Sequence, residues 1–207
     1  MNTLMLEAAH QASVKRFVFI STGCVYPDTN GYPVREDEAL DGPPHDSYYA
    51  AGWMKRYAEI LCRTYAEKIT NPMSCTVVRP ANIYGPFDKF NPNTSHVTAA
   101  QILKVFERQN PIEVWGTGKD IRDVIYIDDF IDGLLSATKI KEPYFEVNIA
   151  SGIGISVLDI LKKSMSIAGH NATITFNQSK PSTIPKLMFD TSRAKERLNF
   201  SPKFSFD

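Results

Sequence analysis

The sequence predicts an α/β fold with a parallel sheet, and three features of its pattern support this. Short runs of β-formers such as residues 16–21 are apolar almost throughout, which is typical of strands buried on both faces. Longer amphipathic stretches such as residues 48–67 lie between them, so that strands and helices alternate. Glycine and proline punctuate the second half, which indicates a smaller lobe of mixed structure.

The first half is predicted to hold two helices, two strands and a long polar loop. Residues 3–9 are rich in strong helix formers, and residues 48–67 form the long amphipathic helix. The polar loop, which contains proline and glycine, covers residues 27–46 and follows the first strand. The second strand covers residues 75–79 and ends at Pro80, which has no N–H for a sheet ladder.

The second half is predicted to hold three more helices and three more strands. The helices fall at residues 97–108, 128–137 and 156–168, and the strands at residues 112–115, 145–149 and 173–176. Residues 125–127 are apolar and lead into the middle helix. Ser156 is the expected N-cap of the last helix, and Asp128 or Asp129 is the expected N-cap of the middle one.

The composition excludes several classes of function. The 23 basic and 23 acidic side chains cancel, so neither nucleic acid nor an anionic membrane is expected as a partner. The three cysteines, Cys24, Cys62 and Cys75, are too few and too scattered for a disulfide framework or a metal site, which favours a cytoplasmic location. No apolar run reaches the roughly 18 residues that a membrane span needs. A small anionic ligand remains possible, because a pocket needs only two or three cations.

A glycine-rich loop for a dinucleotide is missing from the sequence. No G-x-G-x-x-G pattern follows a predicted strand. The short glycine motifs at residues 116–118 and 152–154 lack the third glycine and are predicted to be ordinary turns.

Three motifs in fixed order carry a resemblance to a known family. They are FVFISTGCVYP at residues 17–27, RPANIYGP at residues 79–86 and RDVIYIDD at residues 122–129. Together they resemble the extended short-chain dehydrogenase/reductase family, the NAD-dependent epimerases and dehydratases of nucleotide sugars. The resemblance implies a Rossmann-like parallel sheet whose first βαβ units, with the glycine loop, are missing here.

This resemblance also implies a domain organisation of the chain. Residues 1–85 would form the C-terminal part of the dinucleotide-binding domain. Residues 86–207 would form mainly a smaller substrate-binding lobe, with segments near 123–150 returning to the Rossmann domain. The expected ligands are NADP or NAD and a nucleotide sugar, and the expected assembly is a homodimer.

Further stretches resemble one branch of the family, the GDP-L-fucose synthases, which epimerise C3 and C5 of GDP-4-keto-6-deoxymannose and reduce C4. They are residues 85–92, 94–97 and 114–118, with 179–181 and 185–186 near the end. GDP-mannose 3,5-epimerases share some of these features, and a UDP-hexose 4-epimerase is a further alternative. A 4,6-dehydratase is less expected, because Gly23 and Cys24 stand where an acidic pair is usual. A non-catalytic nucleotide-sugar-binding module is the alternative from another class.

By resemblance, the first motif supplies several catalytic groups. Thr22 would hydrogen-bond the reacting sugar oxygen, and Ser21 beside it would contact the cofactor. Cys24 would work with His96 to epimerise the sugar, because a thiol and an imidazole can exchange protons near neutral pH. In the alternative interpretation these residues are a Ser/Thr turn at a strand end, a small buried hydrophobe and a solvated histidine.

The family's Tyr-x-x-x-Lys pair is altered in this sequence. Lys55 is the expected lysine, which also contacts the cofactor, but Ala51 stands four residues before it. An insertion ahead of the lysine would make Tyr49 the catalytic tyrosine, with Tyr48 as the alternative. Tyr48 lies seven residues from the lysine, about 10.5 Å along a helix axis. Otherwise the catalytic phenol is missing.

Four further residues complete the predicted site. Pro80 would lie near the nicotinamide, and Asn82 would face both cofactor and substrate. Arg122 would pair with the nucleotide diphosphate, a contact that suits the planar guanidinium, and Lys186 would contact the substrate more weakly. A plain ion pair with the neighbouring Asp123 is the alternative for Arg122.

Overall fold

The computed structural model describes residues 1–180 and 184–206, and it contains ten strands and six α-helices within these ranges. Pro181, part of one family-like stretch, lies outside the described residues. The helices are α1 (Asn2–Gln11), α2 (Tyr49–Glu67), α3 (Val97–Phe106), α4 (Ile127–Ala137), α5 (Val157–Ile167) and α6 (Ser192–Leu198). The strands are β1 (Arg16–Ile20), β2 (Pro33–Val34), β3 (Ser74–Pro80), β4 (Asn82–Tyr84), β5 (Ile112–Trp115), β6 (Ile121–Tyr126), β7 (Tyr144–Ile149), β8 (Gly154–Ser156), β9 (Ile174–Asn177) and β10 (Lys186–Phe189).

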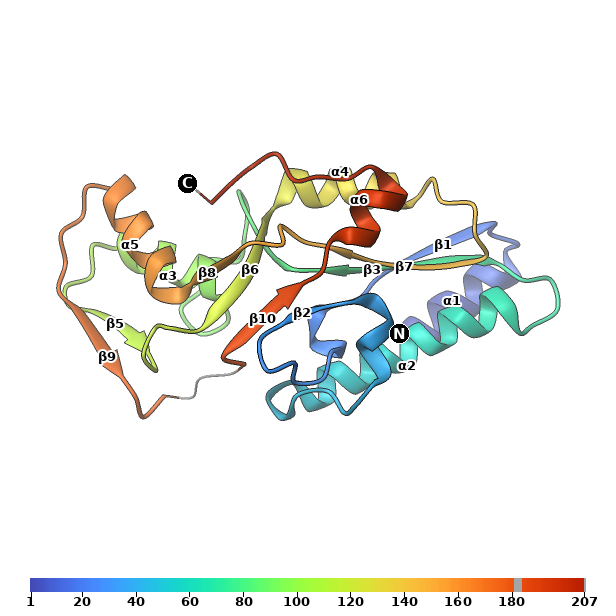
Figure 1. The fold of residues 1–207 in the computed structure, drawn as a ribbon, viewed down its shortest axis with the longest axis horizontal. Helices are drawn as coiled ribbons and strands as arrows, with labels where there is room; N and C mark the ends of the chain where they lie inside the picture. Colours follow the sequence, from blue (N-terminus) through green and yellow to red (C-terminus); the bar gives the residue numbers. More distant parts are fainter. Residues whose placement is uncertain (181–183, 207) are drawn as a thin grey trace.

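A parallel sheet with strand order β1-β3-β7 forms the main layer. The helices α1 and α2 lie on one of its faces, and α4 and α6 lie on the other (Figure 1). The middle strand β3 is therefore covered from both sides, which is why its sequence is apolar without alternation. The predicted α/β fold with a parallel sheet is confirmed.

A second sheet has the order β2-β10-β6-β4, with β8 pairing antiparallel to β6. A separate pair, β5 and β9, lies with α3 and α5 at the far end of the molecule from α1 (Figure 1). The strands β2, β4, β8 and β10 and the helix α6 were not predicted. Four of these elements have only two to four residues, too few to display a period. Residues 125–127, expected to lead into the middle helix, are the last two residues of the strand β6 and the first residue of α4.

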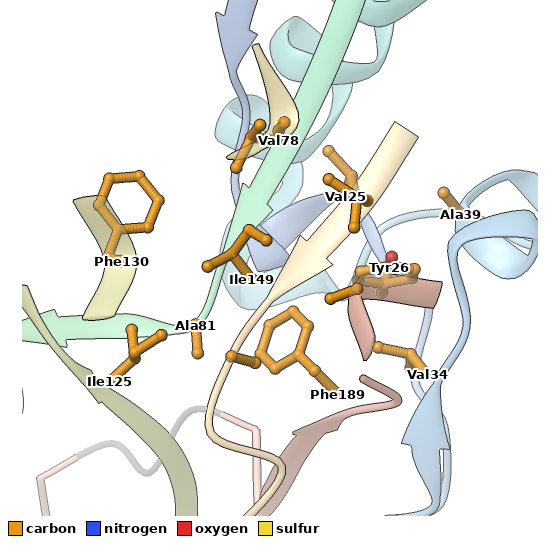
Figure 2. Packing of buried hydrophobic residues seen from close by; sticks show 14 of the residues in the cluster. Val25, Tyr26, Val34, Ala39, Val78, Ala81, Ile125, Phe130, Ile149 and Phe189 are labelled. Carbon is orange, nitrogen blue, oxygen red and sulfur yellow. The ribbon is translucent and has the colours of Figure 1, made fainter. Parts of the chain in front are cut away.

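The largest apolar core cluster joins the two sheets. Figure 2 shows Ile149 of β7 and Phe189 of β10 close to Tyr26, which follows β1. The rings of Tyr26 and Phe189 meet edge to face, with centroids 6.0 Å apart. This packing fixes the end of the first sheet against the second, at the place where the candidate site lies.

Arg79 of β3 is buried at the centre of a polar network. Its Nε and Nη2 donate to the two carboxylate oxygens of Glu59 at 3.1 and 2.8 Å, and Nη2 also donates to Glu146 at 3.0 Å. Its Nη1 donates to the hydroxyl of Tyr26 at 3.1 Å and to the carbonyl of Glu36 at 2.7 Å. All five N–H groups of the guanidinium therefore have an acceptor.

The acidic start of α4 fastens the C-terminal segment. The carboxylate of Asp129 accepts the backbone N–H groups of Lys203 and Phe204, both at 2.9 Å. The expected N-cap at Asp128 or Asp129 is wrong: Tyr126 occupies the N-cap, without a side-chain bond. The buried carboxylate of Asp129 instead binds the C-terminal segment, through the N–H groups of Lys203 and Phe204. The N-cap at Ser156 is confirmed, since its hydroxyl accepts the N–H of Asp159 at 3.0 Å.

Replacement of Asp129 by alanine should lower the free energy of unfolding by about 1.5–3 kcal/mol, because two charge-assisted hydrogen bonds are lost. The matched control is Asp128→Ala, which removes an exposed carboxylate from the same helical turn. Urea unfolding of both variants measures the difference. Equal losses in the two variants would contradict this role of Asp129.

Within residues 1–180 and 184–206, no helix has the length and apolar character needed to cross a membrane.

Candidate functional site

A cavity of about 400 Å³ opens where the main sheet meets the second one. Residues just after β1 and β3 line it, and the carboxyl ends of parallel strands are where α/β folds place their ligands. Six of the predicted site residues line this cavity: Thr22, Cys24, Pro80, Asn82, His96 and Arg122.

The turn that carries Cys24 is held from two sides. The hydroxyl of Thr22 accepts the backbone N–H of Cys24 at 3.3 Å and starts a short 3₁₀ turn. Helix α2 packs against this turn so closely that a Cβ on Gly52 would lie 2.6 Å from the carbonyl oxygen of Cys24. Arg56 donates from Nε to the carbonyl of Val25 at 2.7 Å. These contacts fix the thiol relative to α2.

The environment of Cys24 favours its protonated form. Burial raises the pKa of the thiol, and the hydrogen bond from Thr22 and the charge of Lys55 offset only part of this effect. At neutral pH the group is therefore a thiol that can give a proton rather than a thiolate.

Lys55 does not line the cavity but lies behind it. Its ammonium donates to the carbonyl of Ile20 at 2.8 Å and lies 4.8 Å from the ring centre of Phe19. Burial lowers the pKa of Lys55, while the carboxylate of Glu59 raises it. The lysine is thus fixed at the end of β1, where its charge acts on Cys24.

The tyrosines ahead of α2 have different positions. Tyr49 is the first residue of the helix and its side chain is 63% exposed, outside the cavity lining. Tyr48 is half-buried, packs against the main core cluster and lines the cavity with Cys24. Ala51 is exposed. The structure thus places Tyr48, the alternative, in the cavity lining and Tyr49, the first choice, outside it. Tyr48 is seven residues before Lys55, a step that returns to the same face of a helix, whereas Tyr49 is turned away by about 100°.

Polar residues of β4 and β6 and the residue before α3 also line the cavity. The side-chain amide of Asn82 donates to the carbonyl of Asp123 at 3.2 Å. The exposed His96 is the residue before α3. Arg122 is buried and donates to the carbonyl of Ile184 at 2.6 Å. Its guanidinium also pairs with Asp120 at 3.4 Å.

The carboxylate of Asp123, considered above as a partner for Arg122, binds the loop that follows β7. It accepts the hydroxyl and N–H of Ser151 at 2.7 and 3.0 Å and the N–H of Gly152 at 3.0 Å. Burial raises its pKa to about 6 in spite of these hydrogen bonds. Asp123 thereby holds the loop between β7 and β8 behind the cavity.

Two other predicted residues lie outside the cavity lining, and several residues that were not predicted line it. Ser21 is buried, and its hydroxyl oxygen has no hydrogen-bond partner among residues 1–180 and 184–206. Lys186 is exposed at the start of β10, with its side chain over Gly31. Tyr84 and Phe87 line the cavity but were not predicted. The turn residues between them were a possible signal, since a Gly-Pro dipeptide often marks a functional loop.

The sequence and the fold of this chain can now be compared with those of known proteins. The sequence profile of the NAD dependent epimerase/dehydratase family matches residues 1–150. A GDP-L-fucose synthase of Sinorhizobium fredii is 31% identical over all of this chain and 66% of its own length. The chain spans 62–66% of the length of the curated GDP-L-fucose synthases that it matches.

Solved structures agree with this match. A GDP-L-fucose synthetase from Naegleria fowleri bound to NADP superposes with a TM-score of 0.87 at 26% identity, over 99% of this chain and 67% of the other. A UDP-glucose 4-epimerase from Thermotoga maritima with UDP-glucose gives a TM-score of 0.86 at 27% identity, over 99% and 63%. Since the family profile covers more than half of its residues, the chain belongs to the NAD-dependent epimerase/dehydratase family.

Proposed function

We propose that the protein containing this chain epimerises and reduces a nucleotide sugar, with GDP-4-keto-6-deoxymannose as the substrate. The observation that carries the proposal is that Cys24 and His96, far apart in the sequence, line one cavity together with Thr22. The likeness to GDP-L-fucose synthases supports the choice of a GDP-linked keto sugar.

In this proposal the chemistry is proton exchange at the carbons beside the ketone. One group removes a proton from such a carbon, and another delivers a proton to the opposite face. His96 removes the proton and Cys24, whose raised pKa keeps it protonated, delivers one. The hydroxyl of Thr22 hydrogen-bonds the ketone oxygen, on which negative charge develops. Arg122, which also lines the cavity, pairs with the diphosphate.

The cofactor side of the site fits the nicotinamide end of NADP or NAD. Pro80 and Asn82 line the cavity, and the buried hydroxyl of Ser21, which has no partner among the described residues, precedes the cavity residue Thr22 in the chain. When bound, the cofactor supplies hydride to C4 of the sugar. The residues of this chain would hold only that end, because the sequence has no glycine loop for the pyrophosphate.

We assign the phenol to Tyr48 rather than to Tyr49. The family spacing would place the tyrosine at Ala51, which is exposed and has no hydroxyl. Tyr48 lines the cavity together with Thr22 and Cys24, so we assign to its hydroxyl the proton that the reduced C4 oxygen receives. The other phenol in the lining, that of Tyr84, donates to the carbonyl of Ser205.

Two statements about the whole protein belong to the same proposal. A homodimer would cover the exposed apolar stripe on α2, whose members are Tyr49, Trp53, Tyr57 and Ile60. A cytoplasmic location would suit the three free cysteines.

A second candidate function is a non-catalytic nucleotide-sugar-binding module, which Ala51 specifically favours. Without the phenol at the family position, the cavity could bind its ligand and leave it unchanged. Another epimerase activity, on GDP-mannose or a UDP-hexose, is the alternative among enzymes.

Deuterium exchange tests the proposed activity. The protein, expressed from its full reading frame, is incubated in D₂O with GDP-4-keto-6-deoxymannose and NADPH, and the product is examined by NMR. We expect deuterium at the carbons flanking the ketone together with NADPH oxidation. His96→Asn and Cys24→Ser should bind the substrate but lose the exchange, while His10→Asn on α1 should keep it.

The other outcomes separate the alternatives. Binding of the nucleotide sugar without exchange or NADPH oxidation would identify a binding module. Absence of binding to any nucleotide sugar would overturn the proposal.

A further inference from the structure

Phe87 has an unusual position for a large apolar side chain. It lines the cavity, yet its relative accessibility is 102%, so the ring touches almost nothing in the protein. A single exposed aromatic residue is common on surfaces, but one at the mouth of a cavity can be buried by whatever enters.

The backbone holds this ring in place at some cost. Phe87 has φ 65°, in the left-handed region that bulky residues avoid. Before it, Gly85 has φ 155°, and a Cβ there would lie 2.5 Å from Ile127. After it, the N–H of Asp88 donates back to the carbonyl of Gly85 at 3.4 Å. Strained residues that the surroundings fix in this way are concentrated at ligand sites.

The loop that carries Phe87 is anchored at both ends beside the reacting groups. It leaves β4, whose first residue is Asn82, and it ends at His96, the residue before α3. Near its end, the hydroxyl of Ser95 donates to the carbonyls of Lys89 and Asn91 at 2.5 and 2.7 Å. Phe87 is therefore on the stretch between two other cavity residues, Asn82 and His96.

We propose that the ring of Phe87 packs on the hexose of the bound nucleotide sugar and excludes water from its reacting carbons. The inference rests on the proposed function and adds a substrate-contacting residue to it. A hexose ring presents an apolar face of C–H groups, which an aromatic ring can cover. Exclusion of water strengthens the hydrogen bonds that act on the ketone.

Calorimetric titration with two ligands tests this contact. GDP-mannose carries a hexose and GDP does not, so a contact with the sugar affects only the first. For Phe87→Ala we expect the Kd of GDP-mannose to rise about tenfold and the Kd of GDP to stay within about twofold. The matched control is Phe90→Ala, since Phe90 is 46% exposed on the same loop but does not line the cavity.

Each other outcome has a defined meaning. An equal loss for GDP and GDP-mannose would place the ring on the base or the phosphates and overturn the inference, as would no loss for either. If the wild-type protein bound neither ligand, the proposed function would fail as well. Phe87→Gly, which removes the ring and accepts the positive φ, should weaken GDP-mannose binding as much as Phe87→Ala without lowering Tm.

Discussion

Arg79→Met is expected to lower the free energy of unfolding by about 3–5 kcal/mol, the cost of breaking a buried ion pair from one side. Methionine keeps the apolar length of the side chain but removes five donors. Glu59, which is itself buried, then loses both of its bonds to the guanidinium. The hydroxyl of Tyr26 and the carbonyl of Glu36 lose theirs too.

Urea unfolding measures this loss, and a surface arginine provides the matched control. Arg63 pairs with Glu67 at 3.2 Å one turn apart on α2, and its side chain is exposed. Arg63→Met should cost only about 0.3–0.5 kcal/mol. The double variant Arg79→Met with Glu59→Gln should recover part of the loss, because the uncompensated charge is gone. A cost for Arg79→Met no larger than that for Arg63→Met would contradict the role of the network.

Tyr48→Phe is expected to reduce kcat for the reduction of the keto sugar by about 10²–10⁴-fold, the usual contribution of a positioned general acid. The ring stays, so packing and substrate binding should change little. Tyr49→Phe should leave kcat within about twofold, because this exposed side chain lies outside the cavity. Both variants are assayed by NADPH oxidation alongside the Kd for the substrate.

A rescue variant makes this test sharper. Ala51→Tyr places a phenol four residues before Lys55, on the same face of α2. In the Tyr48→Phe background it should restore a large part of kcat. If Tyr49→Phe were the damaging change, the assignment to Tyr48 would be wrong. If neither variant lost activity, the phenol would have no part in the reaction.

The long elements of the fold could be predicted because their sequences carry a clear period. Helix α2 and the strands β1 and β3 fall within a residue or two of the predicted bounds. The second sheet could not be foreseen from β2 or β10, since two to four residues show no alternation and are defined by their partners. These strands are recognised only from their pairing with segments that are distant in the sequence.

The site was predictable to the extent that strand ends and motifs define it. Thr22, Cys24, Pro80 and Asn82 follow strands that the sequence reveals, and these strands bring them together. The position of the catalytic tyrosine was harder to predict, because successive side chains of a helix are turned by about 100° relative to one another. Tyr48 and Tyr49 are neighbours and therefore point in different directions, and the motif spacing alone did not decide which of them lies at the cavity.

The attachment of the C-terminal segment to Asp129 has a practical consequence for work with this protein. The hydroxyl of Tyr84, a cavity residue, donates to the carbonyl of Ser205 at 3.3 Å, and Phe206 packs against the same ring at 5.0 Å. A substitution in this segment, such as one at Phe206, would therefore disturb the surroundings of Tyr84 at the cavity. Ligand-binding measurements on such a variant would report on the cavity as well as on the segment itself.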